Sequence, residues 1–458
     1  MAGSDPYAAL LASPLGKRLA GSLGLPRPTE LRRYVPGEPI LDGAALVGGL
    51  PGGAESGPLA EAVEAVLRAD GIEIGDPFDT TEVAAIVCDL ADARQPADLE
   101  RLRAVVAPSL KRLGPSGRVL VLGRHRGPDL DPTARAVQRA LVGATKSIAK
   151  ETRRGGTANL VLVGPGAEGA VESTVRFLLS GRAAYVSGQV VSVGAVAAGD
   201  VAVPFEPVDW TQPLADRVAV VTGAARGIGA AVAEVLSRDG ATVVCVDVPA
   251  AGEALVRTAN RVGGTALQVD VTANDAGRRI AEHAHARHGG LDIVVHNAGI
   301  TRDKLLANTD EARWAQVIEV NLAAVLRMNE VLLAPGGLGD GGRMVLVSSL
   351  AGVAGNRGQV SYAASKAGLA GLAEALGGDP DLRARGITVN AVAPGFIETE
   401  MTARIPLATR ELGRRLNSLQ QGGLPVDVAE TIAWLAQPGS GGVTGQVVRV
   451  CGQSLLGA

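Results

Sequence analysis

The stretch that most constrains the fold is a short aliphatic run followed by a glycine-rich turn and a helix-forming segment. Val218–Val221 is typical of a buried strand, residues 222–229 form the string TGAARGIG, and an Ala- and Val-rich segment continues to Ser237. The glycines allow a tight turn and close approach of a pyrophosphate, and the N-terminus of the helix offers free N–H groups. This order of elements predicts a parallel α/β fold with a nucleotide site at the end of the strand.

An acid at the end of the next aliphatic run refines that site. Asp247 lies in ATVVCVDV, eighteen residues after Gly229. A carboxylate there suits the ribose hydroxyls and repels a 2′-phosphate, whereas the nearby Arg226 could meet such a phosphate. We therefore expect NAD(H) to be favoured over NADP(H). Asp270, which ends a third strand with Val271, could contact the adenine or be a simple strand-end acid, and both alternatives stay open.

Three polar residues downstream have the spacing needed for proton transfer. Ser349 follows an apolar run, Tyr362 comes thirteen residues later, and Lys366 follows after four more. Residues four apart share one face of a helix, so we expect Tyr362 and Lys366 to point the same way. A free phenol titrates near about 10, and a neighbouring cation would move its pKa toward neutrality. The alternative is that Tyr362 and Lys366 are ordinary surface residues of this helix.

Two further polar positions surround this trio. Asn321 lies in an apolar helix, where it could bond to a backbone carbonyl or hold a water that feeds the lysine and tyrosine. Small residues at Asn297-Ala298-Gly299 leave room for a cofactor after a strand, and we expect His296 beside them to be a local hydrogen-bonding residue. Pro394-Gly395 follows another strand.

Bulk properties limit the possible classes of protein. Of 458 residues only 2% are aromatic and 47% are hydrophobic, so the core must be aliphatic. The net charge of -3 gives no case for nucleic acid or an anionic membrane surface. Three scattered cysteines show no metal or disulfide spacing and favour a reducing compartment. With no signal peptide and no unbroken apolar span in view, we expect a cytoplasmic protein without bound metal.

The first half of the chain also alternates between strand and helix patterns. We expect a lead-in over residues 1–38, a domain over 39–203, a proline-rich linker over 204–213, and a second domain over 214–458. The alternation predicts an α/β fold with two doubly wound, parallel-sheet (Rossmann-like) domains. The segments expected in the first domain are strands at 45–49, 82–90, 118–123, 158–163 and 188–193 and helices at 59–69, 98–113, 132–153 and 172–179.

The two halves share strings at matching depths. Residues 173–194 (STVRFLLSGRAAYVSGQVVSVG) align with residues 430–452 (ETIAWLAQPGSGGVTGQVVRVCG), and RVLVLG from Arg118 aligns with RMVLVS from Arg343. In this register Arg124, Ala134 and Gln138 stand opposite Ser349, Tyr362 and Lys366. None of these three can perform acid–base chemistry, and the first half lacks a glycine turn of the right spacing. We therefore expect a degenerate first copy, although shared composition alone could produce such strings.

The second half resembles the classical short-chain dehydrogenase/reductase family. The strings that carry the resemblance are TGAARGIG, HNAG, VSSLAGVAGNRGQVSYAASKAG and PGFIET, together with Asn321. NAGITRDKLL is similar to the 3-oxoacyl-acyl-carrier-protein reductases within it. The whole chain resembles the high-molecular-weight, two-domain form of that reductase found in mycobacteria. His296 departs from the family, which usually has Asn there.

The resemblance implies roles for individual residues. Tyr362 would protonate the substrate oxygen, Lys366 would bind the ribose and lower the pKa of the tyrosine, Ser349 would orient the carbonyl, and Asn321 would hold a relay water. The implied reaction is hydride transfer from NAD(P)H to a 3-oxoacyl thioester of coenzyme A or an acyl carrier protein. The expected cofactor contacts, besides Tyr362 and Lys366, are Gly223, Arg226, Gly227, Ile228, Gly229, Asp247, Asp270, Val271, Asn297, Ala298, Gly299, Pro394, Gly395, Ile397 and Thr399.

Other functions remain possible from the sequence. A short-chain dehydrogenase could act on another alcohol, ketone or steroid-like substrate, and a scaffold could bind nucleotide without turnover. Family resemblance also implies a homo-oligomer, a dimer or a tetramer. Arg404, Arg410, Arg414 and Arg415 could dock an acidic carrier or a coenzyme A phosphate, but we expect them to form a solvated helix face.

Overall fold

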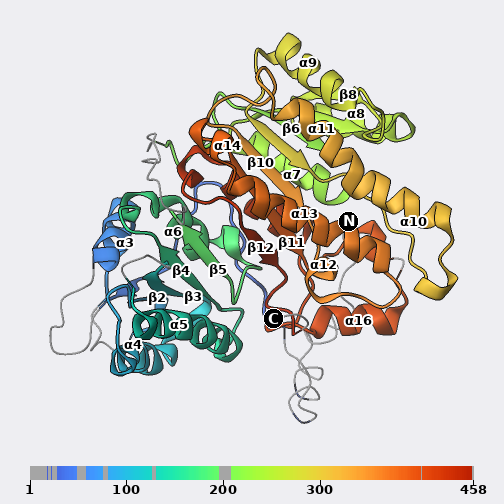
Figure 1. Ribbon diagram of the computed structural model, residues 1–458. Coiled ribbons are helices and arrows are strands. Elements are labelled where there is room, and N and C mark those ends of the chain that lie inside the picture. Colours follow the sequence, from blue (N-terminus) through green and yellow to red (C-terminus); the bar gives the residue numbers. More distant parts are fainter. Residues whose placement is uncertain are drawn as a thin grey trace.

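The computed structural model describes residues 18, 22, 28–48, 58–75, 81–125, 130–194, 208–403 and 405–455 (Figure 1). Two parallel sheets carry the chain, one for each half. Parallel strands must be buried on both faces, and the aliphatic strands of this chain satisfy that requirement. The expected α/β class with two Rossmann-like sheets is confirmed.

The first sheet has five strands in the order β1-β2-β3-β4-β5. Helices α3 and α6 pack on one face, and α4 and α5 pack on the other. The bounds are β1 Ala45–Val47, α3 Pro58–Ala69, β2 Val83–Asp89, α4 Glu100–Leu110, β3 Leu113–Arg124, α5 Pro132–Glu151, β4 Thr157–Val163, α6 Glu172–Leu179 and β5 Val190–Val193.

The second sheet has seven strands in the order β12-β11-β10-β9-β6-β7-β8. The order reverses beside β6, which is where doubly wound sheets bind ligands. The strands are β6 Val218–Thr222, β7 Thr242–Asp247, β8 Thr265–Gln268, β9 Ile293–His296, β10 Arg343–Val347, β11 Thr388–Pro394 and β12 Val447–Val450. The helices are α7 Gly227–Arg238, α8 Gly252–Arg261, α9 Ala276–His288, α10 Glu311–Ile318, α11 Ala324–Leu332, α12 Leu350–Ala354, α13 Val360–Gly377, α14 Pro380–Ala384, α15 Glu400–Ala403, α16 Leu407–Arg415 and α17 Pro425–Ala436.

The boundary predictions differ from the structure mainly at element ends. The helix expected over residues 98–113 corresponds to α4, which begins after a 3-10 turn. It also ends earlier than expected, because β3 already starts at Leu113. Of the expected linker, 204–207 lie outside the described residues, and Trp210 packs its ring against the Arg176 guanidinium at 4.7 Å. Of the lead-in, Tyr34 packs at the junction of the halves, as described below.

The internal repeat is visible in matching side-chain contacts. Arg118 at β3 donates to the backbone oxygen of Ser180, and Arg343 at β10 donates to that of Gln437. The side chains of Asn159 in β4 and Asn390 in β11 each donate to a backbone oxygen and accept from a backbone N–H of the segment before the next strand. These pairs hold the same positions in the two aligned strings. The two sheets therefore share one plan over five strands.

The halves meet through α6 and α17 with approximate two-fold symmetry. Phe177 and Trp434, which occupy equivalent positions, stack with ring centroids 4.3 Å apart and an interplanar angle of 3°. The Gln446 side chain accepts from the Ser192 N–H at 2.8 Å, and the Gln189 side chain accepts from the Arg449 N–H at 3.0 Å. Such reciprocal contacts are the mark of an isologous interface.

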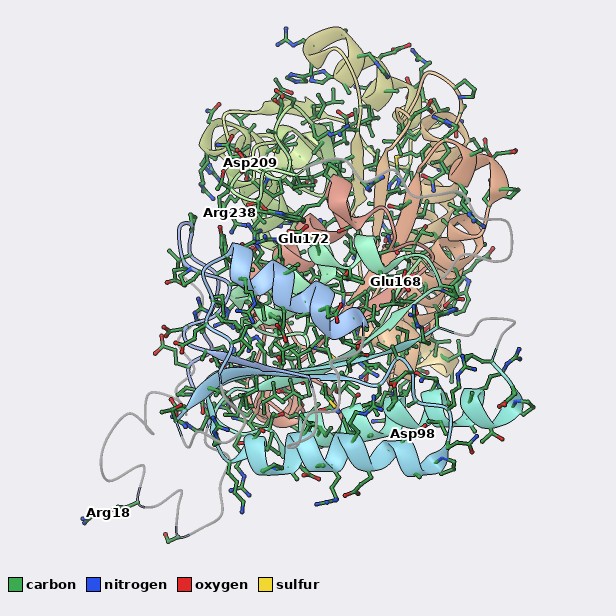
Figure 2. All side chains as sticks on the ribbon, turned by 90° about the vertical axis from the view of Figure 1, so that its left-hand side faces the viewer. Arg18, Asp98, Glu168, Glu172, Asp209 and Arg238 are labelled. Carbon is green, nitrogen blue, oxygen red and sulfur yellow. The ribbon has the colours of Figure 1, made fainter. Side chains whose placement is uncertain are left out.

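A buried charge cluster closes one side of this junction. The Arg182 guanidinium bonds to Asp239 and Glu430, and Arg238 bonds to the same two carboxylates. The Tyr34 ring lies over both guanidinium groups, at 4.0 Å from that of Arg182 and 4.8 Å from that of Arg238. Arg238 marks this junction in Figure 2.

Some features of the described residues bear on the class of protein. Cys88, Cys245 and Cys451 are free and buried. No helix in the described part of the chain is long and apolar enough to cross a membrane. Within the same residues, His, Cys, Asp and Glu form no group of three that could hold a metal ion.

Candidate active site

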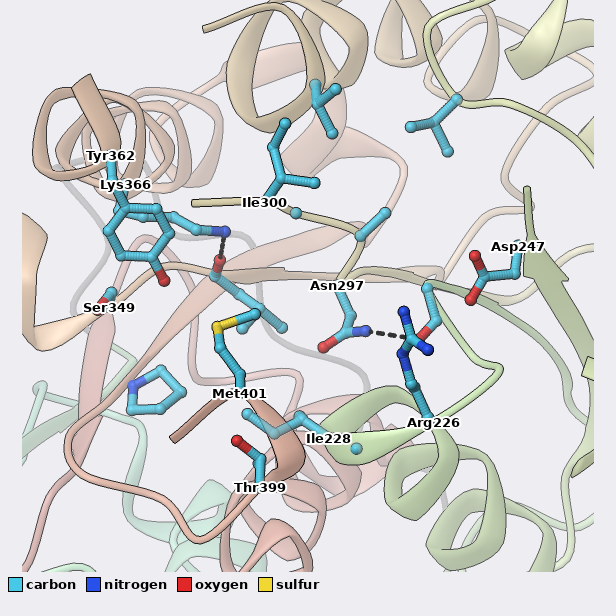
Figure 3. Close-up of a pocket in the computed structure, with 18 of the residues that line it drawn as sticks. Arg226, Ile228, Asp247, Asn297, Ile300, Ser349, Tyr362, Lys366, Thr399 and Met401 are labelled. Atoms are coloured by element: carbon cyan, nitrogen blue, oxygen red, sulfur yellow. Dashed lines mark hydrogen bonds between the residues drawn. The ribbon is translucent and has the colours of Figure 1, made fainter. Parts of the chain in front are cut away.

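A cavity of about 800 Å³ opens along the carboxyl ends of the second sheet's strands. It extends from the turn after β6, past the ends of β7 and β9, to the starts of α12 and α13 (Figure 3). This is the edge at which the strand order reverses. One continuous cavity therefore joins the predicted nucleotide turn to the predicted proton-transfer residues.

The glycine turn has the shape of a phosphate cradle. Gly223 has φ +68°, and a Cβ there would lie 2.9 Å from the Cα of Ala298. A Cβ on Gly229 would lie 2.1 Å from the oxygen of Gly223, so only glycine lets α7 pack so closely against β6. Gly227, with φ +61°, begins α7 and has nothing within 4 Å of its missing side chain. The turn leaves open space at a helix N-terminus, which fits a pyrophosphate.

Asp247 ends β7 and lies at the far end of the cavity, near Arg226. Its carboxylate accepts hydrogen bonds from the Ala225 N–H at 3.0 Å and the Val248 N–H at 2.8 Å. These bonds fix the carboxylate across the turn from the helix. Arg226 also lines the cavity, so an anion and a cation both face the place expected for the ribose.

Asp270 and Asn297 have different roles at neighbouring strand ends. Asp270 lines the cavity and also caps its own turn by accepting from the Thr272 N–H and hydroxyl. The Asn297 amide donates to the backbone oxygens of Thr222 and Gly223, at 3.0 and 3.1 Å. Asn297 thus holds the glycine turn in place. Both alternatives for Asp270 are compatible with this geometry.

Ser349, Tyr362 and Lys366 come together at the other end of the cavity. Ser349 caps α12, Tyr362 lies in the first turn of α13, and Lys366 follows one turn later. Ser349 is hydrogen-bonded to the Tyr362 side chain. The Lys366 ammonium lies 5.8 Å from the Tyr362 ring centroid and donates to the Val347 oxygen at 2.7 Å. The expectation that the tyrosine and lysine face the same way is confirmed.

The protonation of this trio differs from the simplest expectation. Burial raises the pKa of Tyr362, and the hydrogen bond from Ser349 offsets part of that rise. Burial also lowers the pKa of Lys366 to about 8. The expected lowering of the tyrosine pKa by the lysine is therefore not seen, because desolvation outweighs other effects on the phenol.

Asn321 lies behind the cavity wall rather than in it. It is fully buried at the centre of a π-helical turn, Glu319–Ala323, between α10 and α11. Its side chain accepts from the Ile300 N–H at 2.8 Å and donates to the Ile300 oxygen and the Ser365 hydroxyl. The hydrogen bonds of this side chain are thus made with protein groups, chiefly the backbone of Ile300, which is the first of the two alternatives considered from the sequence. Turns of this type are often found at functional sites.

Most predicted residues line the cavity, and two do not. Gly229 allows α7 to pack closely against β6, and Asn321 lies behind the cavity wall. Every other residue of the predicted set lines the cavity. The sequence did not point to a group of residues that also line it, Ile300, Arg302, Gln316, Glu319, Val320 and Met401. Ile300 and Arg302 lie in the NAGITRDKLL string but were not assigned to the site, and the other four come from helix faces, so only the folded chain places this group in the cavity.

Two predictions about flanking residues have opposite outcomes. His296 is buried, its ring bonds to Asn329 at 2.9 Å, and burial lowers its pKa to about 4. Its expected role as a local hydrogen-bonding residue is confirmed. The expected solvated face is wrong for Arg414, which is buried and paired with Glu398 and Glu411. The carboxylate of Glu398 arrives from the end of β11, which the helix pattern could not indicate. Arg404 lies outside the described residues.

Comparison with known proteins identifies the second half. A family model described as "Enoyl-(Acyl carrier protein) reductase" matches residues 223–452, half of the chain. The chain belongs to the short-chain dehydrogenase/reductase family. As a member of this family it uses an NAD(P) dinucleotide, and the open glycine turn fits that group.

Several bacterial relatives share this half. The chain is 41% identical over 242 residues to the 3-oxoacyl-[acyl-carrier-protein] reductase FabG of Pseudomonas aeruginosa, with 52% of this chain and 97% of the relative covered. The proteins of the same name from Thermotoga maritima and Escherichia coli are 39% and 36% identical, with 98% and 96% of each relative covered. Nearly the whole length of each relative therefore aligns with about half of this chain.

Proposed function

We propose that the protein reduces the keto group of a 3-oxoacyl thioester to the 3-hydroxyacyl thioester in fatty-acid metabolism. The observation that carries the proposal is the meeting of Ser349, Tyr362 and Lys366 in one cavity with an open glycine turn. The named activity of the bacterial relatives supports the choice of substrate.

The roles of the three polar residues follow from their geometry. The Ser349 hydroxyl and the Tyr362 hydroxyl bond to each other, so a keto oxygen beside them can contact both. When bound, the dihydronicotinamide supplies the hydride that the keto carbon accepts. Because burial keeps Tyr362 protonated at neutral pH, its hydroxyl is in the form that donates a proton to the keto oxygen. A protonated phenol is the form that the reductive direction requires.

Lys366 and Asn321 support these groups in the proposal. With a pKa of about 8, the ammonium of Lys366 is mostly charged at neutral pH and can bind a ribose hydroxyl as well as the Val347 oxygen. Asn321 fixes the loop at Ile300 and the hydroxyl of Ser365 behind the lysine, and a relay water near its π-helical turn remains part of the proposal.

We also infer a preference for NADH. The Asp247 carboxylate is fixed by two backbone N–H groups, so it cannot easily turn away from a 2′-phosphate. Arg226 opposes this effect. The ratio of kcat/KM for NADH to that for NADPH tests the inference, and a ratio below one would refute it.

The remaining features of the proposal concern organisation. We take residues 39–203 and 214–458 as the two domains of the high-molecular-weight form, with a catalytically silent first domain. The substrate is a coenzyme A or acyl-carrier-protein thioester, the protein forms a dimer or tetramer, and its free buried cysteines suit the cytoplasm.

The decisive experiment uses the purified full-length chain. Acetoacetyl-CoA should cause NADH oxidation at 340 nm, about the absorbance maximum of reduced nicotinamide, with 3-hydroxybutyryl-CoA as product. Longer 3-oxoacyl thioesters and unrelated ketones serve as comparison substrates. Turnover of other ketones without turnover of any 3-oxoacyl thioester would contradict the proposal and favour another dehydrogenase substrate.

A further inference from the structure

The two halves share their junction with approximate symmetry, and Tyr185 is a position at which that symmetry breaks. In the aligned strings Tyr185 of the first half stands opposite Gly442 of the second. A Cβ on Gly442 would lie 3.1 Å from Val193 and 3.3 Å from Ala170, so the first half leaves little room for a side chain there. Tyr185, in contrast, places a complete ring in the second half.

The ring of Tyr185 fills a slot made by glycines. Tyr185 is fully buried. A Cβ on Gly423 would lie 2.5 Å from its Cε1, and a Cβ on Gly452 would lie 2.8 Å from its Cε2. Its hydroxyl donates to the Gln421 oxygen at 2.7 Å, and its backbone oxygen accepts from the Gly452 N–H at 2.9 Å. The close fit fixes both the ring and the chain around it.

A second contact from the first half reaches the same loop. The Gln421 side chain donates to the Thr29 oxygen at 2.7 Å. The loop between α16 and α17 therefore bonds to the first half through both the oxygen and the side chain of Gln421.

This loop is bonded directly to the wall of the cavity. The Gly423 N–H donates to the Phe396 oxygen at 3.0 Å, and the Gly423 oxygen accepts from the Glu398 N–H at 2.8 Å. Between them lies Ile397, which lines the cavity together with Thr399. Within the second half, this wall is also held by the pairing of Glu398 with Arg414 and by the hydrogen bond from the Thr402 hydroxyl to the Ile397 oxygen at 2.7 Å. A displacement of Gly423 would move Ile397 with it.

We propose that Tyr185 is a positioning residue, through which the catalytically silent half holds the Phe396–Thr402 wall of the substrate cavity in place. The inference rests on the proposed function for its kinetic consequence. It gives the first half a task in the reaction, although none of the described residues of that half lines the cavity.

The test compares two variants that each remove one buried hydroxyl from the junction. Tyr185→Phe keeps the ring and loses the bond to Gln421, whereas Ser173→Ala loses a hydrogen bond to the Ser440 hydroxyl at 2.7 Å. One net hydrogen bond corresponds to a change of about fivefold. We therefore expect Tyr185→Phe to raise KM for acetoacetyl-CoA by about three- to tenfold, with kcat within about twofold and the dissociation constant of NADH unchanged. Ser173→Ala should leave KM unchanged.

Amide hydrogen exchange provides a readout that does not depend on turnover. Residues 396–402 and 417–424 should exchange faster in Tyr185→Phe than in the wild type, and at the wild-type rate in Ser173→Ala. Tyr185→Leu should enlarge both effects. Unchanged KM and exchange in Tyr185→Phe, or equal changes in Ser173→Ala, would overturn the proposal. Absence of wild-type turnover would refute the proposed function alone, since hydrogen exchange would still test the role of Tyr185.

Discussion

The two halves of the chain carry different residues at one equivalent position, and this difference separates a nucleotide site from a closed one. Ala45 pairs with Ala85 in the first sheet, and Ala219 pairs with Ile293 in the second. Four residues beyond these partners lie Asp89 and Asn297. The Asn297 amide donates to the carbonyls of the glycine turn and leaves the start of α7 open.

Asp89 acts in the opposite sense. Its carboxylate accepts from the N–H groups of Leu59 and Ala60 in the first turn of α3, at 3.1 and 3.0 Å, and from that of Ala91. The groups that would bind a phosphate are therefore occupied by the chain itself. Among the described residues the first sheet also lacks counterparts of β8 and of β7, the strand that ends in Asp247. The comparison shows that a shared scaffold does not preserve a site.

The catalytic end of each half shows the same contrast. Gln138 of α5 stands where Lys366 stands in α13. The Gln138 side chain accepts from the Arg124 N–H and donates to the oxygens of Leu90 and Ala93. Lys366 has one backbone partner, Val347, and faces the cavity. The neutral amide closes the first half by bonding, whereas the ammonium leaves a charge available in the second.

The largest expected effect comes from a substitution that removes one oxygen atom from the second half and so makes it more like the first. Tyr362→Phe removes the proposed proton donor, and Ala134 at the aligned position of the first half has no such group either. We expect kcat with acetoacetyl-CoA to fall by about 10³-fold, within the usual range for loss of a general acid. Far-UV circular dichroism and the NADH dissociation constant should stay at their wild-type values. Residual activity within tenfold of the wild type would mean that another group donates the proton.

The next prediction tests whether the buried charge cluster holds the two halves together. Arg182→Met leaves the carboxylates of Asp239 and Glu430 with only Arg238 between them. We expect the free energy of unfolding in urea to fall by about 3 kcal/mol, because buried carboxylates lose a partner. Arg103→Met, which removes an exposed pair with Glu100, is the control and should change it by less than about 0.5 kcal/mol. Equal effects in both variants would show that the cluster does not hold the halves together.

A third prediction concerns the charge of Lys366. Burial lowers its pKa from 10.5 to about 8, so between these values the unfolded chain binds a proton that the folded chain does not. Stability should therefore rise with pH across this window, by up to about 3 kcal/mol from this group. Lys366→Gln introduces the residue that the first half has at the aligned position, Gln138, and should lack this contribution. Unfolding is measured from about pH 7.5 to about 10.5, which spans nearly the whole window. Parallel profiles for the two proteins would contradict the prediction.

The smallest expected effect lies in the first half. Asp89→Ala leaves three backbone N–H groups without their acceptor. Because burial raises the pKa of Asp89, part of the gain from these bonds is already offset, and we expect a loss of about 1–2 kcal/mol. NADH should still bind with a stoichiometry near one per chain, since the first sheet, as far as it is described, has no counterpart of the strand that carries Asp247. Glu64→Gln, which changes a half-buried carboxylate of α3 that is paired with Arg68, is the control. A second bound NADH in Asp89→Ala would show that the carboxylate alone closes the first half.

The sequence predicted the elements and most of the candidate site because both depend on local patterns. The glycine turn, Asp247 and the Tyr362–Lys366 pair were found where helix and strand periodicity placed them. Arg414 was wrongly expected on a solvated face, because its partner Glu398 comes from another element. Gln316 and Met401 line the cavity without any local signal. The raised pKa of Tyr362 also depends on burial, which spacing does not measure.

The sequence by itself determined the α/β class, the repeated plan and most of the candidate site, because strand period, helix period and glycine turns depend on neighbouring residues. Only the tertiary structure decided that Asp89 closes the first half and that Tyr185 reaches the loop that is bonded to the cavity wall of the second. Both depend on contacts between residues far apart in the chain, and such contacts form only when packing brings distant segments together.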